Sequence, residues 1–163
     1  MFLQSSFIME NEIKPIQITE ASIHKEIDLL QSCIERMSKN SFSCKGWDLT
    51  LITGVFVLIQ NGINYEYILI TILLVNLCFW VLDSNYLLLE QKYRDKYDWV
   101  IQMRKNGNTD FQYDLNPNNQ NTILYANKKR SLIKTMFSNT ILLMYGGITI
   151  LIIVFTIKTI LGG

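Results

Sequence analysis

Histidine and cysteine are scarce in this chain of 163 residues, and their scarcity excludes several kinds of site. The single histidine, His24, has no cysteine or second histidine at a metal-binding spacing, so we predict no metal site. The three cysteines are an odd number and include no CxxC pair, which argues against a disulfide framework. There is also no Ser/His/Asp set and no phosphate-binding loop. We therefore expect no catalytic residues, no cofactor and no enzymatic activity.

A large excess of one charge is absent as well. The net charge is +1, and nothing in that balance predicts binding to nucleic acid. We interpret the basic run Lys128–Lys134 as a signal that orients the apolar segment after it. Residues 1–18 lack the basic segment and cleavage site of a secretory signal, so we interpret them as a flexible arm.

Three apolar stretches dominate what the chain does contain: Trp47–Gln60, Tyr67–Leu82 and Thr135–Ile157. The first two are near the lower length limit for crossing about 30 Å of hydrocarbon, and the third is long enough to cross alone. The short connection Asn61–Glu66 contains Asn-Gly, which favours a tight reversal. We predict an all-α integral membrane protein with three transmembrane helices, a hairpin over 46–82 and a third helix over 135–161.

The basic residues are distributed unevenly around these stretches. Five precede the first stretch, nine lie between the second and third, and one follows the third. Because cytoplasmic flanks retain Lys and Arg, this bias predicts a cytoplasmic amino terminus, a cytoplasmic 83–134 segment and an external carboxyl terminus. We expect the bacterial inner membrane as the location. The fourteen basic residues on the inner side are Lys14, Lys25, Arg36, Lys39, Lys45, Lys92, Arg94, Lys96, Arg104, Lys105, Lys128, Lys129, Arg130 and Lys134.

The cytoplasmic part is predicted to be mostly helical. An amphipathic helix over 19–45, capped by Thr19, has an apolar stripe and places Lys25, Glu26, Glu35 and Lys39 on its wetter faces, and Gly46 permits a bend before the first span. Segment 83–105 lacks Pro and Gly, so the second span should continue into the cytoplasm as one helix. Segment 106–134 is predicted to be a loop and a short amphipathic run, and a strand near 109–116 stays open. The stripe comprises Ile23, Ile27, Leu30, Ile34 and Met37.

A hairpin that turns near Asn64 places residues whose numbers sum to about 128 at equal depth. Lys45 then lies opposite Asp83, Lys39 near Glu90, and Leu30 near Tyr97. Glu35 falls near Lys92 and Arg94. These matches predict antiparallel pairing of the amino-terminal helix with the extended second helix.

Asp83 is the main candidate site residue, because an ionisable group at the membrane boundary is costly unless it is paired. It could be a gate at a pore mouth, or it could form a structural ion pair with Lys45 or Arg36, with Glu90 in the same charged set. Small and polar residues within the spans are candidates for span packing or pore lining. They are Thr53, Gly54, Asn76, Gly146 and Gly147.

Two segments carry a resemblance to known proteins. Residues 36–47 match the pattern RMxxNSFxxKGW, and residues 80–90 match WxLDxxYLxxE. Both patterns resemble those of a group of small, mostly uncharacterised bacterial membrane proteins, in which they flank a transmembrane hairpin. Arg94 departs from that pattern, since it follows Glu90 by four residues where three are expected. The layout also resembles SLATT-type phage-defence effectors, which implies pore formation in antiviral defence.

The sequence thus favours an oligomeric inner-membrane effector, pore- or channel-like, that is triggered from the cytoplasm. The expected partners are the lipid bilayer, further copies of the chain, and a cytoplasmic protein or nucleotide as trigger. The alternative is a non-enzymatic adaptor that docks a soluble protein at the membrane.

Overall fold

The computed structural model describes residues 19–60 and 65–161, and every regular element within them is helical. This confirms the all-helical class. The expected arm over 1–18 and residues 61–64 of the expected turn lie outside the described residues. The elements are α1 (Glu20–Gln60), α2 (Tyr65–Lys105), α3 (Gln120–Ala126), α4 (Leu132–Met136), α5 (Asn139–Ile141), a π-helical turn η1 (Leu142–Gly146) and α6 (Gly147–Leu161).

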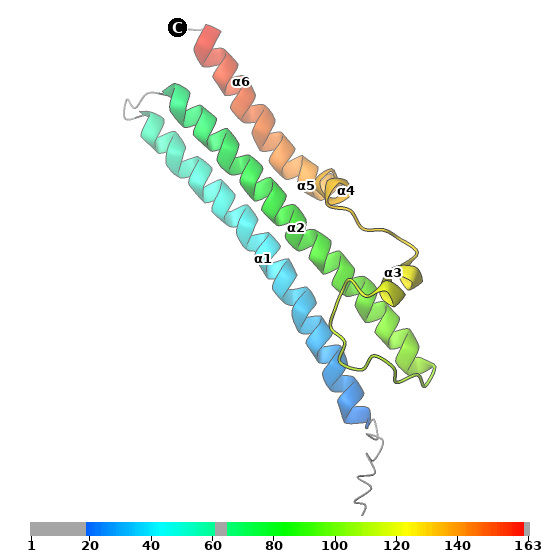
Figure 1. Cartoon of the computed structure of the whole chain (residues 1–163). Helices are drawn as coiled ribbons and strands as arrows, with labels where there is room; N and C mark the ends of the chain where they lie inside the picture. The colour runs from blue at the N-terminus through cyan, green and yellow to red at the C-terminus, as the bar shows by residue number, and fades with distance from the viewer. Residues whose placement is uncertain (1–18, 61–64, 162–163) are drawn as a thin grey trace, which may run out of the picture.

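The two long helices α1 and α2 lie side by side as an antiparallel hairpin, and α6 runs along α2 at one end of it (Figure 1). Each has 41 residues, so each is about 60 Å long at 1.5 Å per residue. Continuity of α2 from Tyr65 to Lys105 agrees with the lack of Pro and Gly after Asp83. The hairpin is therefore about twice as long as the hydrocarbon core of a bilayer is thick.

Helix α1 begins at Glu20, directly after Thr19, and is not interrupted at Gly46, where the sequence permitted a bend. A glycine inside a helix costs only about 1 kcal/mol, and packing along α2 continues on both sides of it. The buried side chains explain this continuity, because they follow one stripe from end to end at spacings of three, four or seven residues. They are Glu26, Leu30, Met37, Ser41, Cys44, Asp48 and Ile52.

Two apolar clusters stabilise the packing of the helices, one in each half of the length of the hairpin. In one half, Leu30 packs with Trp99 and Val100 of α2, and Tyr97 lies against this cluster as the predicted register requires. In the other half, Ile52, Ile72 and Ile152 join α1, α2 and α6. The second cluster shows that α6 covers the hairpin only over its apolar half.

The segment between α2 and α6 contains no strand. Phe111 and Tyr113 have positive φ values of 57° and 59°, which an extended strand does not allow. The short amphipathic run expected within 106–134 is not one helix, because Asn127 adopts a left-handed conformation with φ 46° and ends α3. A second short helix, α4, leads into the apolar segment that begins at Asn139.

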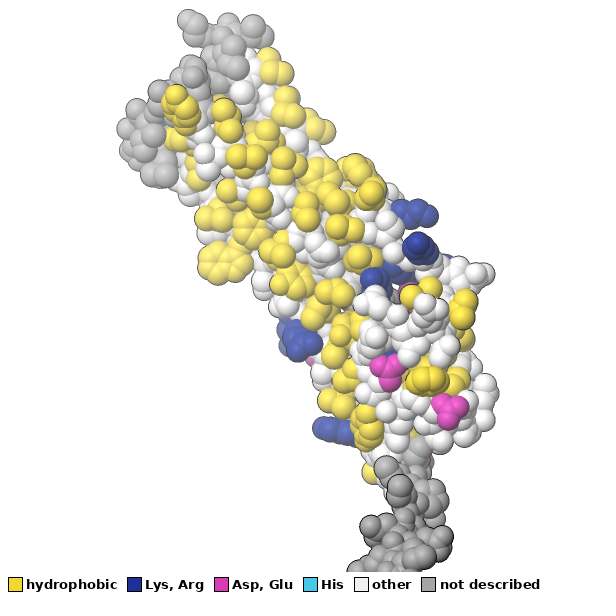
Figure 2. Space-filling model, viewed as in Figure 1, with side chains coloured by type: hydrophobic (Ala, Val, Ile, Leu, Met, Phe, Trp, Pro, Cys, Tyr) yellow, Lys and Arg dark blue, Asp and Glu magenta, His cyan; other side chains and the backbone are white. Residues whose placement is uncertain are grey.

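Two described helices are long and apolar enough to cross a membrane: α2 from Tyr67 onward, and the segment Asn139–Lys158. Over its described residues, helix α1 is not one of them. On the face shown in Figure 2, hydrophobic side chains cover the half that contains α6, and charged side chains gather over the other half. The molecule therefore has an apolar half and a polar half.

Candidate functional site: a buried polar cluster between three helices

Where the apolar and polar halves meet, Asp83 of α2 lies in contact with α1. Its side chain is completely buried, and its Oδ2 atom lies 2.6 Å from Nζ of Lys45, whose side chain is 24% exposed. The hydroxyl of Ser41 donates a hydrogen bond to the other oxygen of Asp83. Lys45 Nζ also donates to Ser41 Oγ over 2.8 Å. The ion pair predicted between Lys45 and Asp83 is therefore present.

A second carboxylate, Asp48, lies one helical turn from Lys45 on the same stripe of α1. It is also completely buried, and neither of its oxygens accepts a hydrogen bond. A buried carboxylate is normally paired or hydrogen-bonded, because removal of its charge from water is costly. Together, Lys45, Asp48 and Asp83 form a cluster of two buried acids and one cation.

Tyr145 of η1 lies over this cluster. It belongs to the helical segment formed by α5, η1 and α6 (residues 139–161), which we call the third helix and which is distinct from α3. Its side chain is fully buried, and its hydroxyl lies within electrostatic range of both Asp83 and Asp48. The ring stacks on Trp80, with centroids 6.3 Å apart and planes 11° from parallel. Trp80 Nε1 in turn donates to the carbonyl oxygen of Met136 over 3.0 Å. These contacts fix the start of the third helix against α2.

The π-helical turn explains how Tyr145 reaches the cluster. A π-turn inserts one extra residue into a helix and is frequent at functional sites. Asn76 of α2, which is fully buried, donates to Thr149 Oγ1 over 2.9 Å and reaches the carbonyl oxygen of Tyr145 at 3.5 Å. Asn76 therefore joins α2 to the third helix inside the chain.

The other predicted charged residues are not part of this cluster. Arg36 lies near Tyr93 and forms no ion pair with any described residue. Glu90 pairs with Arg94 of its own helix at 2.8 Å, so the expected match with Lys39 is absent. Glu35 and Arg94 line one surface groove but are not bonded.

The predicted small residues face outward or lie in open space. Thr53 and Gly54 are exposed on α1, and the Thr53 hydroxyl donates to the carbonyl oxygen of Leu49. A Cβ atom added to Gly147 would meet nothing within 4 Å, and one added to Gly146 would meet only the side chain of Leu142 in the same segment. Neither glycine brings two helices of this chain together, so their role in packing between copies stays a prediction.

At the far end of the polar half, Glu26 and Arg104 form a buried bidentate ion pair. Arg104 Nε and Nη2 donate to the two Glu26 oxygens over 2.8 Å and 2.9 Å. The backbone amide of Tyr113 also donates to Glu26, over 2.9 Å. The expectation that Glu26 faces water is therefore wrong, because this carboxylate holds the loop after α2 against α1.

The same loop is held by a second buried cation, Lys96. Its Nζ atom lies 2.8 Å from Asp114 Oδ2 and 4.4 Å from the centroid of the Trp99 ring. Burial alone would raise the pKa of Asp114, but hydrogen bonds from Lys96, Asn119 and the Asn116 amide hold that pKa below its usual value. The loop over 106–119 is thus docked at two points, by the hydrogen bond from the Tyr113 amide to Glu26 and by the ion pair between Asp114 and Lys96.

Across residues 19–60 and 65–161, no three His, Cys, Asp or Glu side chains are grouped so that they could hold a metal ion. Comparison with protein-family models, with curated proteins and with solved structures finds no match to this chain. The class defined by the fold is an all-helical protein with two helices capable of crossing a membrane.

Proposed function

We propose that this chain is the subunit of an oligomeric bacterial inner-membrane effector that opens a pore or channel in antiviral defence. A cytoplasmic trigger acts on it. Helix α1 crosses the membrane together with α2 and the third helix, which gives three spans. Support for this comes from the Ile52, Ile72 and Ile152 cluster, since it sets α1 at the same depth as the two helices that are apolar enough to cross. The charge bias then gives a cytoplasmic amino terminus and an external carboxyl terminus.

The observation that carries the proposal is the row of buried polar groups beneath the third helix. Asp48, Asp83 and Asn76 are fully buried, and Tyr145 and Thr149 of the third helix cover them. A water-filled path through a membrane needs such groups on its wall. Displacement of the third helix would expose the row and leave the hairpin in place.

Three described threonines on the outer surface of the apolar half contrast with this row. The hydroxyls of Thr50, Thr53 and Thr71 each donate to a carbonyl oxygen four residues earlier in their own helix. They can therefore face lipid without an unsatisfied donor. This contrast between the buried row and the outward-facing threonines favours two states. In the closed state the third helix hides the polar row. In the open state the rows of several copies of the chain together line one pore.

The unbroken helices provide the link to the cytoplasm. Because α1 and α2 pass from the polar half to the apolar half without a break, a change in how they pack at Glu26 and Arg104 can be transmitted to Asp48 and Asp83. A two-state helix pair of this kind is an established form of switch.

Ion flux from liposomes tests the proposal. Purified protein is reconstituted, and the release of entrapped potassium is followed for wild type, Tyr145→Ala and the control Leu143→Ala. Leu143 lies on the same π-turn but is 81% exposed. We expect Tyr145→Ala, which uncovers the polar row, to raise the basal release, and Leu143→Ala to match wild type. A monomer or dimer in nanodiscs, with no release from any variant, would refute pore formation.

The alternative function, an adaptor, is favoured by exposed apolar side chains in the polar half. Leu124 is 75% exposed and Ile133 is 69% exposed. Side chains of this kind can dock a soluble protein partner. An adaptor should release no potassium in any variant, and expression without its partner should leave the membrane potential unchanged.

A further inference from the structure

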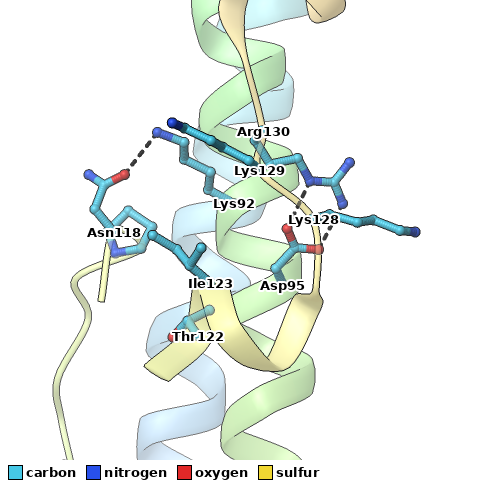
Figure 3. A pocket seen from close by; sticks show the side chains of 9 residues that line it. Lys92, Asp95, Asn118, Thr122, Ile123, Lys128, Lys129 and Arg130 are labelled. Atoms are coloured by element: carbon cyan, nitrogen blue, oxygen red, sulfur yellow. Dashed lines mark hydrogen bonds and ion pairs between the residues drawn. The ribbon is translucent and has the colours of Figure 1, made fainter. Parts of the chain in front are cut away.

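A pocket on the polar half is distinct from the cluster described above. It is formed where α3 and the segment after it cross α2, and Figure 3 shows its lining side chains. Four cations line it, Lys92, Lys128, Lys129 and Arg130, together with one carboxylate, Asp95. Its wall therefore has a net charge of +3.

Two of these cations are held in fixed positions by neighbouring groups. Arg130 Nε and Nη2 donate to the two oxygens of Asp95 over 2.8 Å and 2.7 Å, and Nη1 donates to Gln91 over 3.2 Å. Lys92 Nζ donates to Asn118 Oδ1 over 2.8 Å. The only lining carboxylate is thus engaged by Arg130, and the remaining lysine charges have no acidic partner among the described residues.

The lysines differ in where they point. In Figure 3 the amino groups of Lys92 and Lys129 extend to the same side of the pocket, whereas Lys128 extends to the opposite side. Lys92 and Lys129 are therefore the pair that can bind one ligand group together. Orientation of a membrane protein requires basic residues near the span but no such convergence.

Thr122 lines the pocket without contributing a ligand contact. It is 1% exposed, and its Oγ1 atom is buried and has no hydrogen-bond partner. Because that atom is sealed from solvent, a ligand in the pocket cannot contact it in this structure.

The size of the pocket limits what enters it. Its volume is about 170 Å³, less than the roughly 300 Å³ of the smallest sites that enclose a whole drug-sized ligand. A compact anionic group fits, and the rest of its molecule must stay outside. Ammonium groups are donors that suit phosphate oxygens.

We propose that this pocket binds a phosphate group through Lys92 and Lys129. The group belongs either to the headgroup of an anionic lipid or to a soluble phosphate-bearing molecule, which could be the cytoplasmic trigger. Binding at this pocket does not require pore formation, so it can be tested separately.

Two binding measurements distinguish the two sources. In the first, protein in phosphatidylcholine nanodiscs is titrated with inorganic pyrophosphate by calorimetry. In the second, native mass spectrometry counts phosphatidylglycerol molecules that stay bound after release from mixed-lipid nanodiscs. Each is done with wild type, the double variant Lys92→Gln/Lys129→Gln, and the control Lys25→Gln/Lys105→Gln. The control lysines are exposed, lie outside the pocket, and give the same change in net charge.

We expect binding in one of the two measurements. The pocket double variant should weaken it by about tenfold, as loss of charge-assisted hydrogen bonds implies, and the control should change it by less than about twofold. Pyrophosphate binding identifies a soluble ligand, and retained phosphatidylglycerol identifies a lipid. Absence of binding in both would overturn the site, as would equal loss in the control.

Discussion

Substitution of Lys45 and substitution of Asp83 should lower the stability of the fold by different amounts, although the two residues form one ion pair. Lys45→Gln leaves Asp83 and Asp48 buried together with no cation, because both side chains are fully buried. Loss of one partner of a buried ion pair costs about 3–5 kcal/mol. Ser41 still donates to Asp83, so we expect the lower end of that range, about 3 kcal/mol.

Asp83→Asn should cost less, about 1 kcal/mol, the value of one ordinary hydrogen bond. The variant keeps one cation and one carboxylate, since Lys45 and Asp48 lie one turn apart on α1, and Lys45 is partly exposed to water. The double variant should be more stable than the sum of the two losses predicts, by about 1–2 kcal/mol.

Thermal unfolding in detergent, followed by tryptophan fluorescence, measures these differences. At about 2–4 °C per kcal/mol for a chain of this size, Lys45→Gln should lower the midpoint by about 6–12 °C and Asp83→Asn by about 2–4 °C. Lys39→Gln is the control, because Lys39 is exposed on the same helix and forms no ion pair with a described residue. Equal losses in the two single variants, or strict additivity in the double variant, would refute the reasoning.

Three further predictions concern the loop and the third helix. Arg104→Gln should leave Glu26 buried and unpaired, cost about 3–5 kcal/mol and speed hydrogen exchange at the Tyr113 amide; slow exchange there would contradict this. Because the pKa of Asp114 is lowered in the folded state, its ion pair with Lys96 contributes fully above the ordinary value of 3.8 and is lost as the pH falls below it. Relative to its rate on an unstructured peptide of the same sequence, pepsin should therefore cut the 106–119 loop faster at about pH 3 than at about pH 4.5, and equal relative rates would count against the docking described. Gly147→Leu should leave the thermal midpoint unchanged, because the space beside Gly147 is open, but reduce the oligomer size by light scattering if that face contacts another copy.

The hairpin register could be predicted because it depends on local patterns. One turn centre sets the depth of every residue on two straight helices, so a single correct centre placed Lys45 opposite Asp83 and Leu30 beside Tyr97. The matches at Glu90 and Glu35 failed because exposed side chains such as Lys39, Glu35 and Arg94 can choose among several partners. Glu90 has Arg94 four residues away on its own helix, and that pair needs no second element.

Asp48 could have been identified from the sequence, whereas Tyr145 could not. Met37, Ser41, Cys44 and Asp48 continue the apolar stripe at spacings of four and three, so extension of the stripe past Gly46 places Asp48 in the interface. Tyr145 lies on the π-turn η1 of a separate helical segment, and no local sequence pattern places that turn against α1 and α2.

Glu26 was missed for a different reason. A charge on a helix usually faces water, and its partner Arg104 lies 78 residues away. The sequence offers no local signal for such a pair, because the two residues meet only when the whole hairpin and the loop after it have formed.

The cover that Tyr145 and Thr149 provide has a consequence for synthesis. In the proposed membrane setting, the ribosome makes the hairpin well before the third helix, and during that interval Asp48, Asp83 and Asn76 have no cover from η1 or α6. Carboxylates at such positions resist transfer into lipid. The hairpin should therefore wait at the insertion machinery until residues 139–161 arrive, and the three helices should enter the bilayer as one assembled unit.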